Sequence, residues 1–187
     1  MVMKSVAVYL GSAPGCKDIY KGLAYELGHR LASAGVTLVY GGAAVGTMGA
    51  LADGAAAAGG RVIGVFPKGF RGTKEVRESG LEVVQRGLTE LIETTDFSER
   101  KQLMEVLSDG CIVLPGSFGT LDEMFTYACD RAIDKHTKPI IVFNFEGYYE
   151  PLKQLLANMQ EAGFLKPVMA GAVTFCDTIE EIVGLCR

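Results

Sequence analysis

The sequence predicts an α/β fold in which helices cover both faces of a parallel β-sheet. Short apolar segments rich in β-branched residues alternate with amphipathic helical segments along the chain. These apolar segments lack the polar–apolar alternation of half-exposed strands, so they fit strands buried on both faces. Glycine-rich loops follow three of them, at the end of the strand where parallel α/β sheets bind ligands. We therefore expect a Rossmann-like, doubly wound parallel sheet.

Length and composition fit one domain. The chain has 187 residues, of which 49% are hydrophobic and 21% charged, as in an ordinary soluble globular protein. This length can bury a substantial core but leaves no room for a second domain of usual size. We expect a single domain over residues 1–187.

The first part of the chain contains three strand segments. Residues 5–10 are apolar and end in a glycine-rich turn, and the apolar stripe of a helix follows, ending near Gly35. Residues 37–40 form a second strand, followed by a second glycine loop and a helix with small residues, which can pack close to a sheet. Residues 61–66 form the third strand. The segment 68–79 is charged and lacks an apolar period, so we expect an exposed loop.

The second part of the chain continues the alternation. A helix is expected from Thr120, because Thr120 can cap it and Glu123 occupies the capping-box position three residues later. The other expected elements, in order, are a short strand at 81–85, an uncertain link at 89–94, a helix at 98–108, strands at 111–114, 139–144 and 173–176, a helix around 149–159, and a last helix at 179–186 with its own capping box at Thr178 and Glu181.

The stretch GCIVLPGSFGTLDE, residues 110–123, is the strongest candidate for a functional site. Its strand ends at Pro115, and Gly116 and Gly119 let the loop turn tightly and approach a ligand closely. The N–H groups at the start of the following helix carry partial positive charge. A strand, a glycine loop and a helix N-terminus together predict a phosphate site, although any α/β domain needs glycine-containing turns after its strands.

Charged residues near this loop are further candidates. Arg100 and Lys101 stand in the first turn of a helix, where cations oppose the helix dipole. Either Glu99 and solvent offset them, or one of them faces a bound anion, which an arginine fork suits. Within the central motif, Glu123 is the carboxylate whose spacing returns it to the loop, whereas Asp122 should point elsewhere.

Composition argues against several kinds of partner. The net charge is −4 and no basic tract is present, so binding to a nucleic-acid polymer has no electrostatic basis. No apolar stretch of about 18 residues and no signal-peptide pattern is found, so we expect a cytoplasmic protein without a membrane partner. The five scattered cysteines and two histidines form no cluster, so we expect reduced thiols, no metal and no cofactor.

These residues together resemble the LOG-type proteins, cytokinin riboside 5′-monophosphate phosphoribohydrolases that also carry the label lysine decarboxylase. The family's P-G-G-x-G-T-x-x-E loop is similar to residues 115–123, and its E-R-K to residues 99–101. Its Y-G-G-G-x-x-G-x-M-G loop is similar to residues 40–49. Gly11-Ser12, Lys138-Pro139 and Gly147-Tyr148-Tyr149 also fit the family pattern.

The chain departs from this pattern at several positions. Ser117 replaces the second glycine of the central loop, and Ala43 replaces a glycine of the earlier loop. Phe97-Ser98 stand where Met-His is usual, and Asp130 and Ala132 stand where many members carry Trp and Gln. A phosphate cradle survives at Ser117 only if the φ angle of this residue is negative.

The resemblance implies hydrolysis of the N-glycosidic bond of a nucleoside 5′-monophosphate, AMP or an N6-modified AMP, to a free base and ribose 5-phosphate. It implies Glu123 and Arg100 as catalytic residues and a homodimer as the assembly. The substrate- and phosphate-binding residues that it implies are Gly11, Ser12, Gly41, Gly42, Gly46, Met48, Lys101, Pro115, Gly116, Ser117, Phe118, Gly119 and Thr120.

A binding protein without catalysis is the main alternative. Related Rossmann-like proteins carry the molybdenum cofactor or sense nucleotides without turnover. Glu123 and Arg100 favour catalysis, whereas the departures at Ser117 and Asp130 weaken the argument for it. A true lysine decarboxylase is not expected, because a PLP enzyme needs a Schiff-base lysine and a partner for the pyridinium nitrogen.

Overall fold

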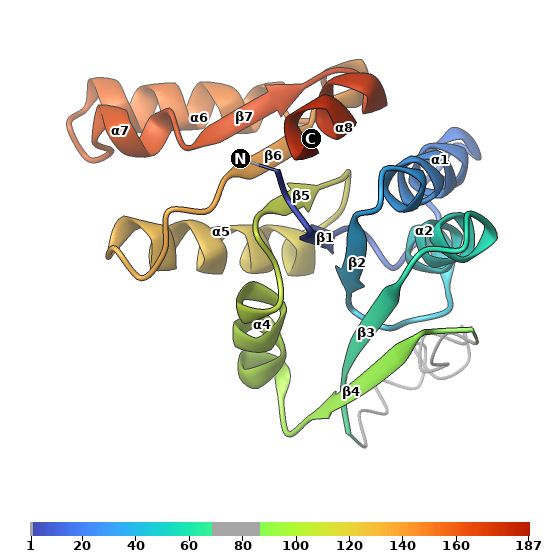
Figure 1. Ribbon diagram of the computed structural model, residues 1–187. Helices are drawn as coiled ribbons and strands as arrows, with labels where there is room; N and C mark the ends of the chain where they lie inside the picture. Colours follow the sequence, from blue (N-terminus) through green and yellow to red (C-terminus); the bar gives the residue numbers. More distant parts are fainter. Residues whose placement is uncertain (1, 69–86) are drawn as a thin grey trace.

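All strands of the described chain lie in one parallel sheet. The computed structural model describes residues 2–68 and 87–187 (Figure 1). The strand order is β4-β3-β2-β1-β5-β6-β7, and every neighbouring pair is parallel. The predicted Rossmann-like, doubly wound α/β fold is therefore confirmed. The strands are β1 (Ser5–Tyr9), β2 (Thr37–Tyr40), β3 (Val62–Pro67), β4 (Glu90–Thr94), β5 (Cys111–Val113), β6 (Ile140–Phe143) and β7 (Val173–Cys176).

Helices cover both faces of the sheet (Figure 1). Successive β1 residues serve opposite layers, since Val8 packs with α1, α2 and α8 while Tyr9 packs with α4, α5 and α6. None of the helices in the described ranges combines the length and apolarity needed to cross a membrane. The helices are α1 (Ile19–Ser33), α2 (Gly46–Ala57), α4 (Phe97–Val106), α5 (Phe118–Ala132), the 3₁₀ turn η1 (Phe145–Gly147), α6 (Glu150–Glu161), α7 (Pro167–Ala170) and α8 (Ile179–Cys186).

The order of strands reverses between β1 and β5. From β1 the chain runs outward through β2 and β3, whereas β5, β6 and β7 extend the sheet in the opposite direction. The loops after β1 and β5 therefore leave the same sheet edge toward opposite faces, which opens a crevice between them. They still touch at their bases, where Gly11 N–H donates to the Pro115 carbonyl over 3.3 Å. The predicted meeting of glycine loops at one edge is thus confirmed.

Two predicted elements differ in the structure. The segment expected as an uncertain link is strand β4, which pairs with β3 at the edge of the sheet. Glu90, Leu91 and Glu93 are exposed there, so β4 lacks the apolar run that marked the buried strands. The predicted strand at 81–85 and most of the predicted loop at 68–79 lie outside the described residues.

Helix α5 begins at Phe118 rather than at Thr120, with Ser117 at the N-cap position and no side-chain cap. The predicted capping box of Thr120 and Glu123 is therefore wrong. Thr120 lies in the first helical turn, and Glu123 turns toward Arg100. The capping box of α8 is confirmed, since the Glu181 N–H donates to Thr178 Oγ1 and the Thr178 N–H donates to the Glu181 carboxylate.

The two ends of the described chain lie side by side (Figure 1). Met3 N–H donates to the carbonyl of Cys186 over 2.9 Å, which ties the segment before β1 to the end of α8. The core layer formed by α1, α2 and α8 therefore includes residues from both ends of the sequence.

Candidate active site

A cleft lies at the carboxyl ends of β1, β2, β3 and β5. It encloses about 770 Å³, counting the solvent space at its mouth. All three glycine loops and the first turns of α4 and α5 contribute to its walls. The lining residues are Leu10, Gly11, Ser12, Gly41, Ala43, Met48, Phe66, Pro67, Phe97, Arg100, Ser117, Gly119, Thr120 and Glu123.

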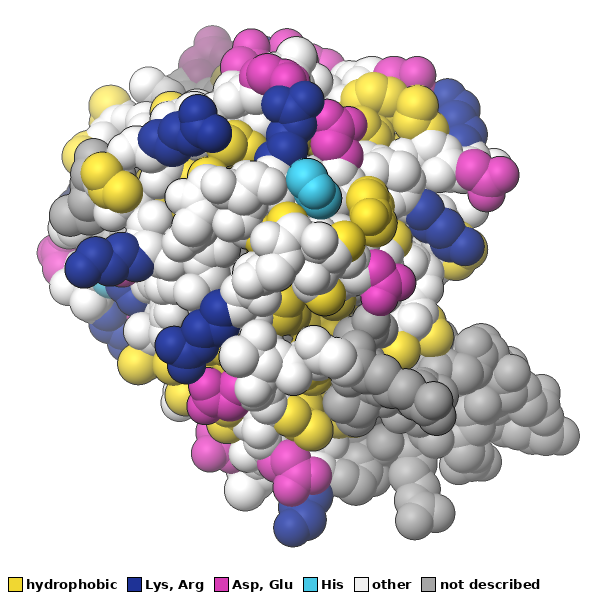
Figure 2. Space-filling view, turned by 45° about the vertical axis from the view of Figure 1, so that its right-hand side comes forward, with side chains coloured by type: hydrophobic (Ala, Val, Ile, Leu, Met, Phe, Trp, Pro, Cys, Tyr) yellow, Lys and Arg dark blue, Asp and Glu magenta, His cyan; other side chains and the backbone are white. Residues whose placement is uncertain are grey.

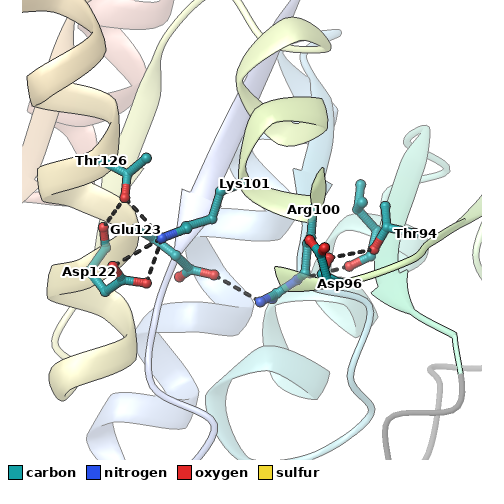
Figure 3. Close-up of polar contacts among 8 residues, drawn as sticks. Thr94, Asp96, Arg100, Lys101, Asp122, Glu123 and Thr126 are labelled. Carbon is teal, nitrogen blue, oxygen red and sulfur yellow. Dashed lines mark hydrogen bonds and ion pairs between the residues drawn. The ribbon is translucent and has the colours of Figure 1, made fainter. Parts of the chain in front are cut away.

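A buried ion pair forms the polar wall of the cleft. Arg100 Nη1 lies 3.1 Å from Glu123 Oε1, and each side chain is 11% exposed (Figure 3). Arg100 Nε also donates to the Val65 carbonyl over 3.0 Å, and the guanidinium carbon lies 5.6 Å from the centre of the Phe97 ring. The guanidinium is therefore held by β3, α4 and α5 together, with a fixed orientation toward the cleft.

The environment of Glu123 changes its proton affinity. Burial raises the pKa of the Glu123 carboxyl, and the positive charge of Arg100 opposes part of this rise. Asp122 adds to the increase in pKa, while Lys101 lowers it slightly. A carboxylate with a raised pKa in a cleft is suited to accept a proton near neutral pH.

Helix α4 is held by caps that explain its charge pattern. The Asp96 carboxylate accepts the Glu99 N–H over 2.8 Å, and the Glu99 carboxylate reaches back to the Thr95 N–H over 2.6 Å. These carboxylates accept hydrogen bonds from backbone N–H groups at the start of α4. Their negative charge also offsets the unfavourable interaction of Arg100 and Lys101 with the helix dipole. Arg100 can then extend into the cleft, while Lys101 points to the neighbouring helix.

The start of α5 presents unpaired backbone donors. The N–H groups of Phe118, Gly119 and Thr120 have no partner within the helix, as expected in a first turn, and no side chain caps them. Ser117 has φ −113° and ψ −152°, which is ordinary extended backbone, so serine fits where the motif has glycine. The condition set for a phosphate cradle at Ser117 is met.

Two glycines are required by close packing around the cleft. A Cβ on Gly41 would collide with the Arg100 guanidinium, so this loop residue leaves space for the catalytic candidate. A Cβ on Gly116 would collide with the side chain of Thr120. Gly42 and Gly46 have positive φ angles of 76° and 56° and shape the second glycine loop without lining the cleft.

The structure brings together most of the predicted site residues, but not all. Lys101 lies outside the cleft, where its Nζ contacts the Asp122 carboxylate at 2.9 Å and Thr126 Oγ1 at 3.0 Å (Figure 3). Asp122 points away from the cleft, as predicted. Phe118 is 91% exposed and is absent from the lining. The predicted residues that line the cleft are Gly11, Ser12, Gly41, Met48, Arg100, Ser117, Gly119, Thr120 and Glu123.

The apolar wall of the cleft was missed by sequence reasoning. Phe66 and Pro67 come from the end of β3, and Phe97 comes from the start of α4. The position of β3 in the parallel sheet was the available signal, because its last residues had to reach the same edge as the glycine loops. This part of the lining thus offers aromatic and aliphatic surface to a ligand.

A second cleft adjoins the first at the strand-order reversal. It encloses about 570 Å³ and shares Gly11, Ser12 and Ser117 with the first cleft. Pro115 and Gly116 lie on this side of the loop, together with Tyr20 and Tyr148.

Charged side chains of both signs are interspersed on the face of the molecule in Figure 2, with no continuous basic patch. Among the described residues, no cluster of His, Cys, Asp or Glu is arranged to hold a metal ion.

Fold and site define a Rossmann-like α/β protein with a buried carboxylate–guanidinium pair beside a free helix N-terminus. Residues 48–186 match the family described as "Possible lysine decarboxylase". The chain is 38% identical to the cytokinin riboside 5′-monophosphate phosphoribohydrolase of Rhodococcoides fascians, covering 98% of this chain and 89% of that protein. Identity to the Mycobacterium tuberculosis protein of the same name is 36%, covering 97% and 92%. The chain belongs to the LOG family of phosphoribohydrolases.

Solved structures with lower sequence identity share the fold. The molybdenum cofactor binding protein of Rippkaea orientalis superposes with a TM-score of 0.68 at 23% identity, covering 97% of this chain and 93% of that chain. The molybdenum cofactor carrier protein of Chlamydomonas reinhardtii gives a TM-score of 0.69 at 19% identity, covering 97% and 94%. At these identities the likeness supports the fold alone.

Proposed function

We propose that this chain hydrolyses the N-glycosidic bond of a nucleoside 5′-monophosphate, AMP or an N6-modified AMP, and releases the free base and ribose 5-phosphate. The observation that carries this proposal is the buried Arg100–Glu123 pair, which shares one cleft with the uncapped N-terminus of α5. The 5′-phosphate would accept hydrogen bonds from the N–H groups of residues 118–120. The family relationship supports the same reaction, because the similar proteins are named for it.

The reaction breaks the bond between C1′ of the ribose and the base nitrogen. The bonding electrons leave with the base, and positive charge develops on the ribose ring. The Glu123 carboxylate would stabilise this charge and take a proton from the attacking water, whose oxygen bonds to C1′. Arg100 would orient both Glu123 and the substrate. The departing base also requires a proton. Glu123 is the one carboxyl group among the described lining residues, so the proton that it takes from the water would pass to the base nitrogen.

The apolar wall offers a place for the base. Phe66, Met48 and Phe97 line the same cleft as the ion pair, so a purine ring could pack on aromatic and thioether surface while its ribose faces Glu123. An apolar N6 substituent would extend this packing.

The decisive experiment incubates the purified protein with AMP and with N6-isopentenyl-AMP in parallel and follows the free base by chromatography. We expect release of base from at least one nucleotide and none from the Glu123→Gln variant. If neither nucleotide is cleaved while both raise the melting temperature, the site binds nucleotides without turnover. That result would favour the non-catalytic binder or molybdenum cofactor carrier.

We also infer a homodimer in solution. Large apolar side chains are exposed on α4 and at both ends of α5, with exposed fractions of 72% at Val106, 91% at Phe118 and 65% at Ile133. Exposed apolar groups on two neighbouring helices are typical of an association surface. Sedimentation at micromolar concentration should give the mass of two chains, and a monomer throughout that range would contradict this inference.

A further inference from the structure

The Gly147-Tyr148-Tyr149 motif contacts the central glycine loop through two phenol groups. Tyr149 Oη donates to the Leu114 carbonyl over 2.8 Å, and Tyr148 Oη donates to the Gly116 carbonyl over 2.7 Å. The two rings pack edge to face with their centres 4.9 Å apart. Consecutive tyrosines thus hold two carbonyls of the segment that joins β5 to α5.

The other carbonyls of this segment are also occupied. The Pro115 carbonyl accepts the Gly11 N–H over 3.3 Å, and the Ser117 carbonyl accepts the Leu121 N–H over 3.1 Å in the first turn of α5. Each carbonyl from residue 114 to residue 117 therefore has a protein donor. Backbone acceptors are held by the protein, while the donors at the start of α5 remain available to an anion.

The peptide unit between Gly116 and Ser117 is the part of this loop that can rotate most readily. Position 116 must be glycine, because a Cβ would collide with Thr120. Glycine adopts most backbone conformations readily, so nothing in Gly116 itself prevents this peptide from rotating. In a trans peptide the Ser117 N–H points opposite to the Gly116 carbonyl, hence away from Tyr148. Rotation of this peptide by half a turn would place the Gly116 carbonyl oxygen, an acceptor, beside the anion in place of the Ser117 N–H, a donor.

We propose that Tyr148 is a positioning residue that holds the Gly116–Ser117 peptide with its carbonyl in the second cleft and its N–H available to the phosphate. This inference rests on the proposed function insofar as the phosphate occupies the start of α5. The rotated peptide would direct the Gly116 carbonyl oxygen at the phosphate, which disfavours binding of a dianion. Tyr148 therefore acts on the phosphate through the loop, without contacting it.

Ser117 also restrains the orientation of the Gly116–Ser117 peptide. Its φ angle is −113°, and rotation of the preceding peptide by half a turn would drive φ to positive values. A side chain with a Cβ resists that region, whereas glycine does not. Serine at a motif position of glycine thus stabilises the orientation that Tyr148 selects. Removing both restraints should have a larger effect than removing either one.

The position of Tyr148 is itself well supported. The backbone turns through η1 with positive φ angles of 51° at Glu146 and 74° at Gly147. Lys17 Nζ pairs with the Glu146 carboxylate over 2.7 Å, which ties this turn to the loop after β1. The neighbouring Tyr149 is buried, and its N–H donates to Asn144 Oδ1 over 2.8 Å. The Tyr148 ring is 44% exposed, so loss of its hydroxyl alone should leave the fold intact.

The first test needs no ligand. Hydrogen–deuterium exchange of the Leu121 and Gly11 amides, which donate to the Ser117 and Pro115 carbonyls on either side of this peptide, should be about tenfold faster in Tyr148→Phe than in the wild type, and faster still in Tyr148→Phe combined with Ser117→Gly. Tyr25→Phe is the matched control, because Tyr25 lies on α1 with a similar exposed fraction of 43%. Unchanged exchange in Tyr148→Phe would overturn the proposal.

The second test separates the phosphate from the rest of the ligand. In Tyr148→Phe the dissociation constant of AMP should rise about tenfold, while that of adenosine should remain within about twofold of the wild type. Equal losses for both ligands would contradict a role at the phosphate. If wild-type protein binds neither AMP nor N6-isopentenyl-AMP while the exchange result holds, the proposed function fails and the restraint on the loop stands.

Discussion

Glu123 and Arg100 each depend on the other's charge. Without Arg100, burial would raise the pKa of Glu123 further. Without Glu123, the guanidinium would be largely buried, and among the described residues the Val65 carbonyl would remain as its hydrogen-bond acceptor. Breaking such a pair leaves one charge uncompensated in a poorly solvated site. The pair is therefore both a functional group and a constraint on which substitutions the cleft tolerates.

Replacing Glu123 by glutamine should reduce kcat by about 10² to 10⁴, because the variant cannot accept a proton or offset positive charge on the ribose. The steady-state rate of base release measures this loss. Asp122→Asn is the matched control, since Asp122 is the adjacent carboxylate but pairs with Lys101 outside the cleft. Its activity should stay within about twofold of the wild type, and an active Glu123→Gln enzyme would refute the role of Glu123.

The pH dependence of kcat/KM should reflect the raised pKa of Glu123. The reaction needs the carboxylate form, so activity should fall as the pH drops through this pKa, at a higher pH than the ordinary glutamate value of 4.5. A pH–rate profile from weakly acid to neutral pH checks this. An acid limb at or below the ordinary value would show that a different group titrates.

Sequence patterns and the family resemblance pointed to Glu123 and Arg100 separately, but they did not predict that the two side chains form an ion pair. Spacing along a helix distinguished Glu123 from Asp122, because the direction of a side chain depends on helical geometry alone. The same residues suggested a capping box at Thr120, which the structure contradicts. A cap depends on where the helix starts, and the loop packing that moves the start to Phe118 comes from distant residues such as Gly11 and Tyr148.

At the scale of elements, the start of α5 and the loop before it act together. Gly116 packs against Thr120 and also against Gly11 of the first glycine loop. Parallel strands β1 and β5 bring these loops to one edge, and their glycines allow the close contact. The loop and the start of α5 therefore pack as one unit. A substitution at Gly116 should affect both nucleotide binding and the stability of the fold.

Gly116→Ala should lower the free energy of unfolding by about 1–3 kcal/mol and abolish nucleotide binding, because the new methyl group displaces Thr120. Urea unfolding and nucleotide titration measure the two effects. Gly119→Ala is the matched control in the same turn, since a Cβ there meets no atom within 4 Å. We expect its stability to match or exceed that of the wild type by up to about 1 kcal/mol.

Strand β4 shows why some elements escape prediction. It lies at the sheet edge, so most of its residues are exposed, including Glu90 and Glu93. The apolar runs that identified the central strands exist because helices cover both of their faces. An edge strand is specified by pairing with its neighbour β3, a contact between segments that local sequence does not reveal.

At the scale of the whole molecule, strand order decides where the cleft forms. The alternation of strands and helices predicted a doubly wound sheet and glycine loops at one edge. It did not predict that the end of β3 would close the cleft with Phe66 and Pro67, because several strand orders satisfy the same local pattern. The polar half of the site was thus accessible from sequence, and the apolar half required the fold.

Saturating nucleotide should stabilise the whole protein, since the cleft joins loops from β1, β2 and β5 with the start of α4. At a concentration of about 100 times Kd, AMP should add about 2.7 kcal/mol to the free energy of unfolding and raise Tm by about 5–10 °C. Thermal denaturation of Glu123→Gln avoids turnover during the measurement. A Tm that does not change with AMP would show that the nucleotide does not occupy the cleft.

The hydrogen bond between Met3 and Cys186 holds the two ends of the described chain next to each other. The same arrangement of elements in space could then form from a chain in which the elements follow one another from a different starting point. A short linker could close the chain into a ring, and new ends could be opened in the largely exposed residues 162–166 between α6 and α7, none of which lines the cleft. Such a circular permutant should retain both the sheet and the Arg100–Glu123 pair.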